Sequence, residues 1–271
     1  MRLDKYLADM GVGTRKEVRQ KIRDGHVTVG GAAAVDPGMK VDEADEVCLD
    51  GRPLCYEKFV YYMLNKPAGV VSASRDSRER TVIDLMCPEN ELGRTEAAGN
   101  TAEPLERAAK GPGHRADLFP VGRLDKDTEG LLLITDDGEL AHRLLSPKRH
   151  VDKVYYARLD GPVGDREKLL FAEGLQVEEG WTALPAKLTT LAQTSAQCDG
   201  VMAESDEPSE HVLVTIHEGK FHQIKRMFAA VGRDVQYLKR LSMGPLTLDE
   251  ELAPGQWRRL TKEEVSAIIG A

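Results

Sequence analysis

The chain has 271 residues, of which 41% are hydrophobic and 30% are charged, a composition typical of a soluble globular protein with a sizeable core. The sequence has no run of about eighteen apolar residues and no signal-peptide core, so we expect no membrane span and no export. Four scattered cysteines and seven histidines without an HExxH pattern predict neither disulfides nor a metal site. We therefore expect a cytoplasmic protein.

The net charge of -8 would by itself argue against a nucleic-acid partner, but the charges are segregated along the sequence. Residues 1–31 hold seven Lys and Arg against four acids, and residues 220–240 hold six against one. Residues 141–158 hold five against one, whereas residues 193–210 hold five acids and no Lys or Arg. Locally basic surfaces attract phosphate whatever the total charge, so a nucleic-acid partner is not excluded.

The first segment predicts two short helices followed by a strand. Residues 3–9 place apolar side chains on one helix face. Thr14 and Glu17 form the Thr-x-x-Glu capping box of a second helix that ends near Arg23. Residues 27–29 have the pattern of a strand before a Gly-Gly turn. The second helix carries five basic residues, which fit either an ordinary solvated face or a surface that binds phosphates.

Residues 121–144 contain the pattern around which the rest of the chain is organised. Residues 131–134 form an apolar run, too short for a helix and bounded by turn residues, which predicts a buried strand. The loop before this strand holds Asp125 between two cations, Arg123 and Lys126. A loop at the end of a buried strand is a rigid place for a reactive side chain. From its spacing alone, however, a loop aspartate is more commonly a cap or a turn residue.

The other elements follow from periodicity and from turn residues. We expect strands over residues 59–64, 153–159, 211–216 and 235–241, and helices over residues 139–145, over 224–231 and from Thr261 onward. Residues 88–117 and 193–210 are polar or acidic and show no period, so we interpret both as flexible insertions.

Two cations occupy an unusual place in the helix over residues 224–231. Lys225 and Arg226 lie in its first turns, where the helix dipole favours anions by about 0.3–1 kcal/mol. Either both side chains are simply solvated, or a carboxylate or a phosphate lies near them.

Several segments together resemble known families. The N-terminal sequence RLDKYL…GVGTRKEVRQKIRDGHVTVGG resembles the S4 domain, a small RNA-binding module. NKPAG at 65–69, GRLD at 122–125, the Lys-x-Tyr pair at 153–155 and EGKFHQIKRMF at 218–228 resemble the pseudouridine synthases of the RsuA family. The FHQIKRMFAAVG helix and the APGQW ending look most like the branch that modifies small-subunit ribosomal RNA. Sister enzymes in the family modify large-subunit RNA.

The resemblance implies an α+β fold with an S4-like domain at 1–50, a linker at 51–58 and a catalytic domain at 59–271. We expect the catalytic domain to contain a mixed, mainly antiparallel sheet flanked by helices. By resemblance, Asp125 is the catalytic residue, Lys225 or its neighbour Arg226 is its basic partner, and Tyr155 stacks on the base. The residues implied in RNA contact are Arg2, Arg15, Lys16, Arg19, Arg23, Lys66, Arg123, Lys153 and Arg226.

The implied reaction is the isomerisation of a uridine in 16S ribosomal RNA to pseudouridine, which consumes no electrons, phosphate or water and therefore needs no cofactor. The expected partner is ribosomal RNA, within an assembling small subunit and bound by a monomer. One alternative is a catalytically silent assembly factor that binds RNA through its S4 module. Another is a metal-dependent nuclease that uses the four acids Asp125, Asp127, Asp136 and Asp137. The last two acids belong to a predicted turn, which argues against the nuclease.

Overall fold

The computed structural model describes residues 1–270 except 43, 55, 87–117, 147–148 and 193–203. The chain divides into two compact units. The first comprises Met1–Val60 and the described part of Ile83–Leu118, and the second comprises Tyr61–Val82 and Phe119–Ala271. The insertion expected at 88–117 lies outside the described residues, as does the first part of the one expected at 193–210.

The first unit packs two helices against a small antiparallel sheet. Its elements are α1 (Leu3–Asp9), α2 (Arg15–Arg23), β1 (Val27–Val29), β2 (Ala32–Ala33), β3 (Val47–Leu49) and β4 (Arg52–Leu54). The sheet order is β2-β1-β3-β4. The predicted capping box is present, because the Thr14 side chain accepts from the Glu17 N–H and the Glu17 carboxylate accepts from the Thr14 N–H. Strand β4 lies inside the range that we expected to be a linker and pairs with β3.

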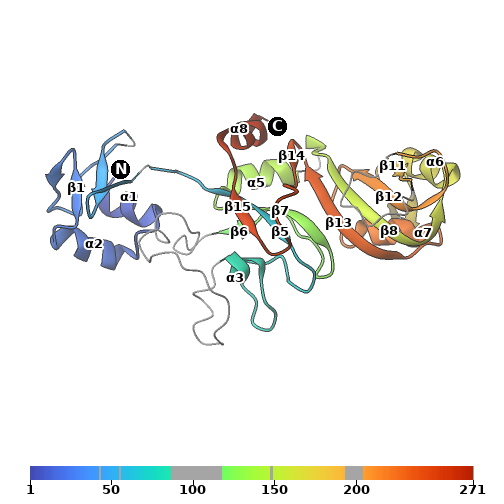
Figure 1. Cartoon of the computed structure of the whole chain (residues 1–271), viewed down its shortest axis with the longest axis horizontal. Coiled ribbons are helices and arrows are strands. Elements are labelled where there is room, and N and C mark those ends of the chain that lie inside the picture. Colours follow the sequence, from blue (N-terminus) through green and yellow to red (C-terminus); the bar gives the residue numbers. More distant parts are fainter. Residues whose placement is uncertain (43, 55, 87–117, 147–148, 193–203, 271) are drawn as a thin grey trace. The chain divides into compact units, whose positions relative to one another are not determined.

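The second unit is built on a nine-stranded sheet in the order β11-β12-β8-β13-β7-β5-β15, with β14 paired to β13 and β6 paired to β7 (Figure 1). The strands are β5 (Tyr61–Lys66), β6 (Phe119–Pro120), β7 (Glu129–Thr135), β8 (Lys153–Val163), β11 (Lys187–Thr190), β12 (Ser209–Ile216), β13 (Val235–Met243), β14 (Leu246–Thr247) and β15 (Trp257–Arg259). A separate hairpin contains β9 (Gln176–Glu178) and β10 (Trp181–Thr182). Only the β13–β7 pair is parallel among the described strands, so the mixed, mainly antiparallel sheet is confirmed.

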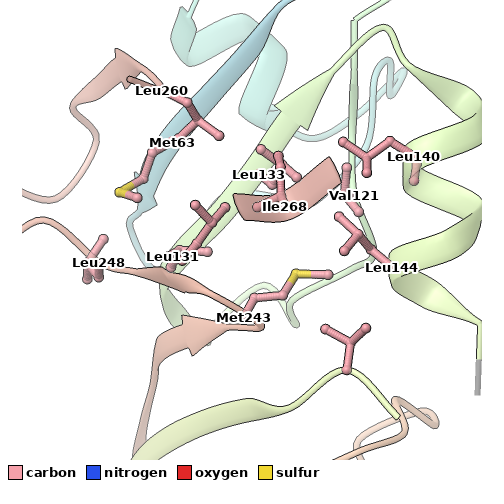
Figure 2. Close-up of a cluster of buried hydrophobic side chains, with 13 residues drawn as sticks. Met63, Val121, Leu131, Leu133, Leu140, Leu144, Met243, Leu248, Leu260 and Ile268 are labelled. Atoms are coloured by element: carbon pink, nitrogen blue, oxygen red, sulfur yellow. The ribbon is translucent and has the colours of Figure 1, made fainter. Parts of the chain in front are cut away.

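Helices cover the sheet of the second unit at its two ends. They are α5 (Gly138–Leu145), α6 (Asp165–Glu173), α7 (Gln223–Ala230) and α8 (Lys262–Gly270). A further helix, α3 (Val82–Met86), spans the boundary between the two units. Helices α5 and α8 lie together near β5, β7 and β15, and α6 and α7 lie near β11, β12 and β8 (Figure 1). Leu140 and Leu144 of α5 and Ile268 of α8 join Leu131 and Leu133 of β7 in one buried cluster (Figure 2). No helix among the described residues is long and apolar enough to span a bilayer.

Several sequence-based boundaries differ from the structure, and two of them show the reason. The strand expected over 59–64 runs from Tyr61 to Lys66, because its pairing with β7 continues to the Lys66–Gly130 pair. The acidic insertion was expected to reach residue 210, but Ser209 already begins β12 and is paired with Val163. In both places, a neighbouring strand decides where the element begins or ends, and the local sequence does not show that neighbour.

Candidate active site

Asp125 lies in the loop between β6 and β7, and buried groups from the end of β5 and from the segment after it hold the backbone of this loop. The Lys66 ammonium donates to the carbonyl oxygens of Lys126 at 3.2 Å and Thr128 at 2.8 Å. The Ser72 hydroxyl donates to the Leu124 carbonyl at 2.9 Å and accepts from the N–H of the same residue at 3.1 Å. These bonds fix the loop on both sides of Asp125, and thus the direction of its carboxylate.

The burial of Lys66 and Lys153 corrects their assignment to RNA contact. Lys66 is 0% exposed, and its third hydrogen bond goes to the Pro67 carbonyl at 3.0 Å. Burial lowers the pKa of Lys66 to about 8, partly offset by the carboxylates of the loop. Lys153 is 6% exposed, donates to the Val151 carbonyl at 2.9 Å, and also has a pKa lowered to about 8 by burial. Neither ammonium can meet a phosphate, because each lies inside the protein.

Lys225 of α7 lies between two carboxylates of the loop. Its Nζ is 3.2 Å from an Asp125 oxygen, and 2.6 and 2.8 Å from the two oxygens of Asp127. Burial would lower the pKa of Lys225, but the hydrogen bonds to Asp127 and Asp125 raise it above the ordinary value. The bond to Lys225 in turn lowers the pKa of Asp127. The negative group expected near the first turn of this helix is therefore present, in the form of two loop carboxylates.

Arg226, the alternative partner of Asp125, points elsewhere. Its guanidinium forms an ion pair with Glu178 of β9 and lies 4.3 Å from the centre of the Trp181 ring. Successive residues of a helix do not share a face, so only one of the two cations can reach the loop. The geometry selects Lys225, and sequence reasoning alone had left the choice open.

A pocket opens beside the Asp125 carboxylate. Its lining residues come from the loop, from β8, β12 and β13, and from the segment leading into α7; they are Arg123, Leu124, Asp125, Thr128, Tyr155, Ile216, Gly219, Lys220, His222, Gln223, Ile224, Lys225 and Leu238.

The pocket brings together several of the residues that the sequence singled out. Tyr155 is 7% exposed and contributes to the lining, whereas Tyr156, on the other face of β8, is hydrogen-bonded to His211. Arg123 is exposed and lies at the same pocket. Sequence reasoning missed His222, whose Nε2 is 3.6 Å from an Asp125 oxygen. It considered Asp127 only as a metal ligand, whereas the structure pairs Asp127 with Lys225.

The five basic residues expected to contact RNA in the first unit divide into two groups. Arg2 and Arg19 both pair with the buried Asp4, at 3.0 and 2.9 Å. The hydrogen bond from Arg2 lowers the pKa of the Asp4 carboxyl against the opposing effect of burial. The other three, Arg15, Lys16 and Arg23, are exposed on α2. Asp4 thus partly neutralises the first group, and the second is free to meet an anion.

The acids of the nuclease alternative do not form a common site. Asp137 caps α5 by accepting from the Leu140 N–H at 3.0 Å, and it also accepts from the Tyr61 hydroxyl at 2.8 Å. Asp125 and Asp127 are both paired with Lys225. Among the described residues, no three His, Cys, Asp or Glu side chains are arranged to hold a metal ion.

Comparisons with known proteins agree on one family over most of the chain. The model described as RNA pseudouridylate synthase matches residues 60–230, and the model of the S4 domain matches residues 1–47. An uncharacterized RNA pseudouridine synthase of Bacillus subtilis is 43% identical over 266 residues, which cover 98% of this chain and 97% of the relative.

Other relatives match over their full length. The ribosomal small subunit pseudouridine synthases A of Vibrio vulnificus and of Escherichia coli K12 are 39% and 36% identical, with 99% of this chain covered in both cases and 99% and 100% of the relatives. A crystal structure of a pseudouridylate synthase superimposes with a TM-score of 0.58 and 32% identity, covering 99% of both chains.

Proposed function

Because this chain belongs to the RNA pseudouridylate synthase family, in its small-subunit (RsuA) branch, we propose that it isomerises one specific uridine of 16S ribosomal RNA to pseudouridine. The family identifies the chain as an isomerase. The full-length relatives that are named for the small ribosomal subunit support the choice of RNA, since the similarity includes both units of the chain. We infer that the enzyme works as a monomer in the cytoplasm, on RNA within an assembling small subunit.

The observation that carries the proposal is the Asp125–Lys225 pair at the pocket that Tyr155 lines. The reaction breaks the bond between C1′ of the ribose and N1 of the base and forms a bond between C1′ and C5. A carboxylate next to the sugar can attack C1′, attack C6 of the base, or remove the proton from C2′, and each route uses an ionised Asp125. The Lys225 ammonium stabilises that anion in a partly dry pocket.

Tyr155 supplies a flat aromatic surface for the base. Its side chain is buried and lines the pocket together with Asp125, so a uracil there would stack on the ring, an interaction worth roughly 1–3 kcal/mol per base. A uridine paired within a helix cannot reach Asp125, so the target nucleotide must be extruded or already unpaired. The isomerisation conserves all atoms and consumes no electrons, so the proposal includes no cofactor.

The S4 unit contributes binding rather than chemistry. The exposed Arg15, Lys16 and Arg23 of α2 present three cations on one short helix, and cations of this kind contact phosphates without reading sequence. Arg2 and Arg19 add charge beside Asp4. Arg123 and Lys220 are exposed at the pocket in the second unit and are suited to contact the backbone of the target strand.

The proposal is tested with Asp125→Asn and ribosomal RNA that carries tritium at C5 of its uridines. Pseudouridine formation releases this tritium to water. The wild-type enzyme should release one equivalent per 16S RNA, supplied either free or in partly assembled small subunits, and Asp125→Asn should release none while binding the RNA with nearly unchanged affinity. Tritium release from 23S transcripts alone would indicate that the substrate is large-subunit RNA instead. Binding without any release by the wild type would favour the silent assembly factor.

A further inference from the structure

The segment leading into α7 carries an aromatic side chain that the protein interior does not use. Phe221 is 75% exposed, and it is the only Phe, Tyr or Trp in the described part of the chain whose side chain is exposed. Its ring stacks on the His222 ring, with the centroids 3.8 Å apart and the planes inclined by 19°. Single exposed apolar residues are common, so exposure alone decides nothing. The position of this ring and the way it is held are more informative.

The stacked pair lies next to the catalytic carboxylate. His222 lines the pocket, and its Nε2 is 3.6 Å from an Asp125 oxygen. One face of the Phe221 ring is taken by His222, and most of its surface is open to solvent. An aromatic surface that borders a pocket for a flipped nucleotide fits a second base, because every nucleobase has a face that can stack.

The backbone around Phe221 is rigid. His222 has φ of 50° and ψ of 32°, a left-handed conformation that residues other than glycine adopt rarely and keep only where neighbouring contacts enforce it. The Arg226 guanidinium donates to the Phe221 carbonyl at 3.4 Å. The Lys220 N–H donates to the Gln223 side chain, which is buried and in turn bonded to Glu218. The ring is therefore held in solvent by a fixed backbone and is not the tip of a loose loop.

Two basic side chains lie close to the aromatic pair. Lys220 directly precedes Phe221, and its Nζ lies 4.9 Å from the centre of the Trp181 ring. The Arg226 guanidinium lies 4.3 Å from the same centre. An exposed aromatic ring near basic side chains is the usual composition of a surface that binds single-stranded nucleic acid, with bases on the ring and phosphates at the cations. Here Lys220 is the exposed cation, because Arg226 is paired with Glu178.

We propose that Phe221, backed by His222, is a nucleotide-binding subsite that stacks on the base next to the target uridine. Extrusion of the uridine removes a stacking partner from its neighbour. The Phe221 ring replaces that partner and so lowers the cost of extrusion. The subsite serves every base, and thus positions the strand without selecting its sequence. This inference rests on the proposed function, since it requires an RNA strand with its target uridine in the Asp125 pocket.

The test compares Phe221→Ala, Phe221→Leu and Phe221→Tyr by tritium release from 16S RNA. Ala and Leu should lower kcat/KM by about 5-fold or more, because both lack a face that stacks, while Leu keeps most of the apolar volume. Tyr should restore the rate to within about twofold of wild type. Leu169→Ala, at a site on α6 that is 59% exposed, is the matched control for loss of an exposed apolar side chain and should change nothing.

A fluorescence experiment separates stacking from a merely structural role. Two short RNAs contain the mapped target uridine and 2-aminopurine on its 5′ or its 3′ side. When the wild type or Phe221→Tyr binds, stacking on residue 221 should quench the 2-aminopurine fluorescence of one of the two RNAs. Binding of Phe221→Leu should leave the fluorescence of both RNAs unquenched. Equal quenching by Phe221→Leu, or unchanged kcat/KM in both Ala and Leu variants, would overturn the subsite. An inactive wild type would refute the proposed function and the subsite with it, whereas an active wild type with indifferent Phe221 variants would refute the subsite alone.

Discussion

Replacement of Lys225 by methionine removes the cation that two loop carboxylates share. At the 3.2 Å that separates Lys225 from Asp125, two unit charges attract by about 1.3 kcal/mol in water and by about 5 kcal/mol at an effective dielectric constant of about 20. Both side chains are about one quarter exposed, at 26% and 25%, so the attraction lies between these limits. Without it, Asp125 and Asp127 also repel each other. Since about 1.4 kcal/mol corresponds to a tenfold change in rate, we expect kcat to fall roughly 10- to 1,000-fold.

The assay is single-turnover tritium release at saturating RNA, with RNA affinity measured separately by filter binding. Lys225→Arg keeps a positive charge and should retain most of the activity that Lys225→Met loses. Lys168→Met is the matched control, because Lys168 also forms an ion pair at 3.2 Å, with Asp165 on α6, away from the pocket. A Lys225→Met enzyme within twofold of the wild-type rate would refute the argument that this ammonium maintains the catalytic anion.

Three further predictions concern stability and RNA affinity. Lys153→Met should stabilise the fold relative to wild type by up to about 3 kcal/mol below pH 8, from the pKa shift of 10.5 to about 8. This difference in stability should shrink as the pH rises from 8 toward 10.5. In that range Lys153 is protonated in the unfolded state but not in the folded state, so the wild type becomes more stable with increasing pH. Urea melts of both proteins at pH 7 and 9.5 test this. Gly130→Ala should destabilise the fold by more than about 2 kcal/mol in thermal melts, because the φ of Gly130 is +99° and a Cβ there would overlap the backbone of β13. Gly138→Ala is the control and should not destabilise in this way, because a Cβ at Gly138 meets open space. Joint replacement of Arg15 and Lys16 by glutamine should reduce the slope of log K against log salt by about 1–2, and an unchanged slope would exclude α2 from the RNA interface.

Local patterns predicted many of the helices and strands, whereas the fold class followed from the family resemblance. The Thr14–Glu17 capping box predicted the start of α2, and the apolar run at 131–134 predicted β7, an interior strand of the sheet. Strand ends were less predictable, because pairing decides them. Residues 65 and 66 look like the start of a turn before Pro67, yet their bonds to β7 keep them in the sheet. The turn begins only where pairing stops.

The candidate site was predicted in part. An anion near the first turn of α7 follows from the helix dipole, and the structure places carboxylates there. The helix dipole does not predict which carboxylate lies closer to Lys225. In the structure, the Lys225 Nζ is 2.6 Å from Asp127 and 3.2 Å from Asp125. The sequence does not predict the left-handed backbone conformation of His222, because histidine rarely adopts it, whereas a glycine often indicates such a position. The exposed Phe221 beside it was therefore interpreted as part of the helix motif only.

The buried lysines show what single-sequence reasoning cannot reach. The family resemblance implied that Lys66 and Lys153 contact RNA, which agreed with the general rule that lysine is almost never fully buried unless paired. Lys66 is buried because three backbone carbonyls, two of them in the catalytic loop about 60 residues later, converge on its ammonium. No local pattern encodes that convergence. A lysine before proline at the end of a strand has the same appearance whether its side chain faces solvent or such a cage.

The arrangement of these contacts divides the site into two sides with different tasks. Lys66 and Ser72 hold the Asp125 loop through its backbone carbonyls, so the position of the Asp125 carboxylate depends on bonds that are buried inside the protein. Lys225, His222 and the exposed Phe221 all come from α7 or the residues leading into it, and α7 is anchored separately by the packing of Phe228 on Phe171. Changes on the α7 side can therefore alter how a strand is held without moving Asp125. In this proposal, the chemistry depends on the Asp125 loop together with Lys225, and the way the strand is held depends on the residues that lead into α7.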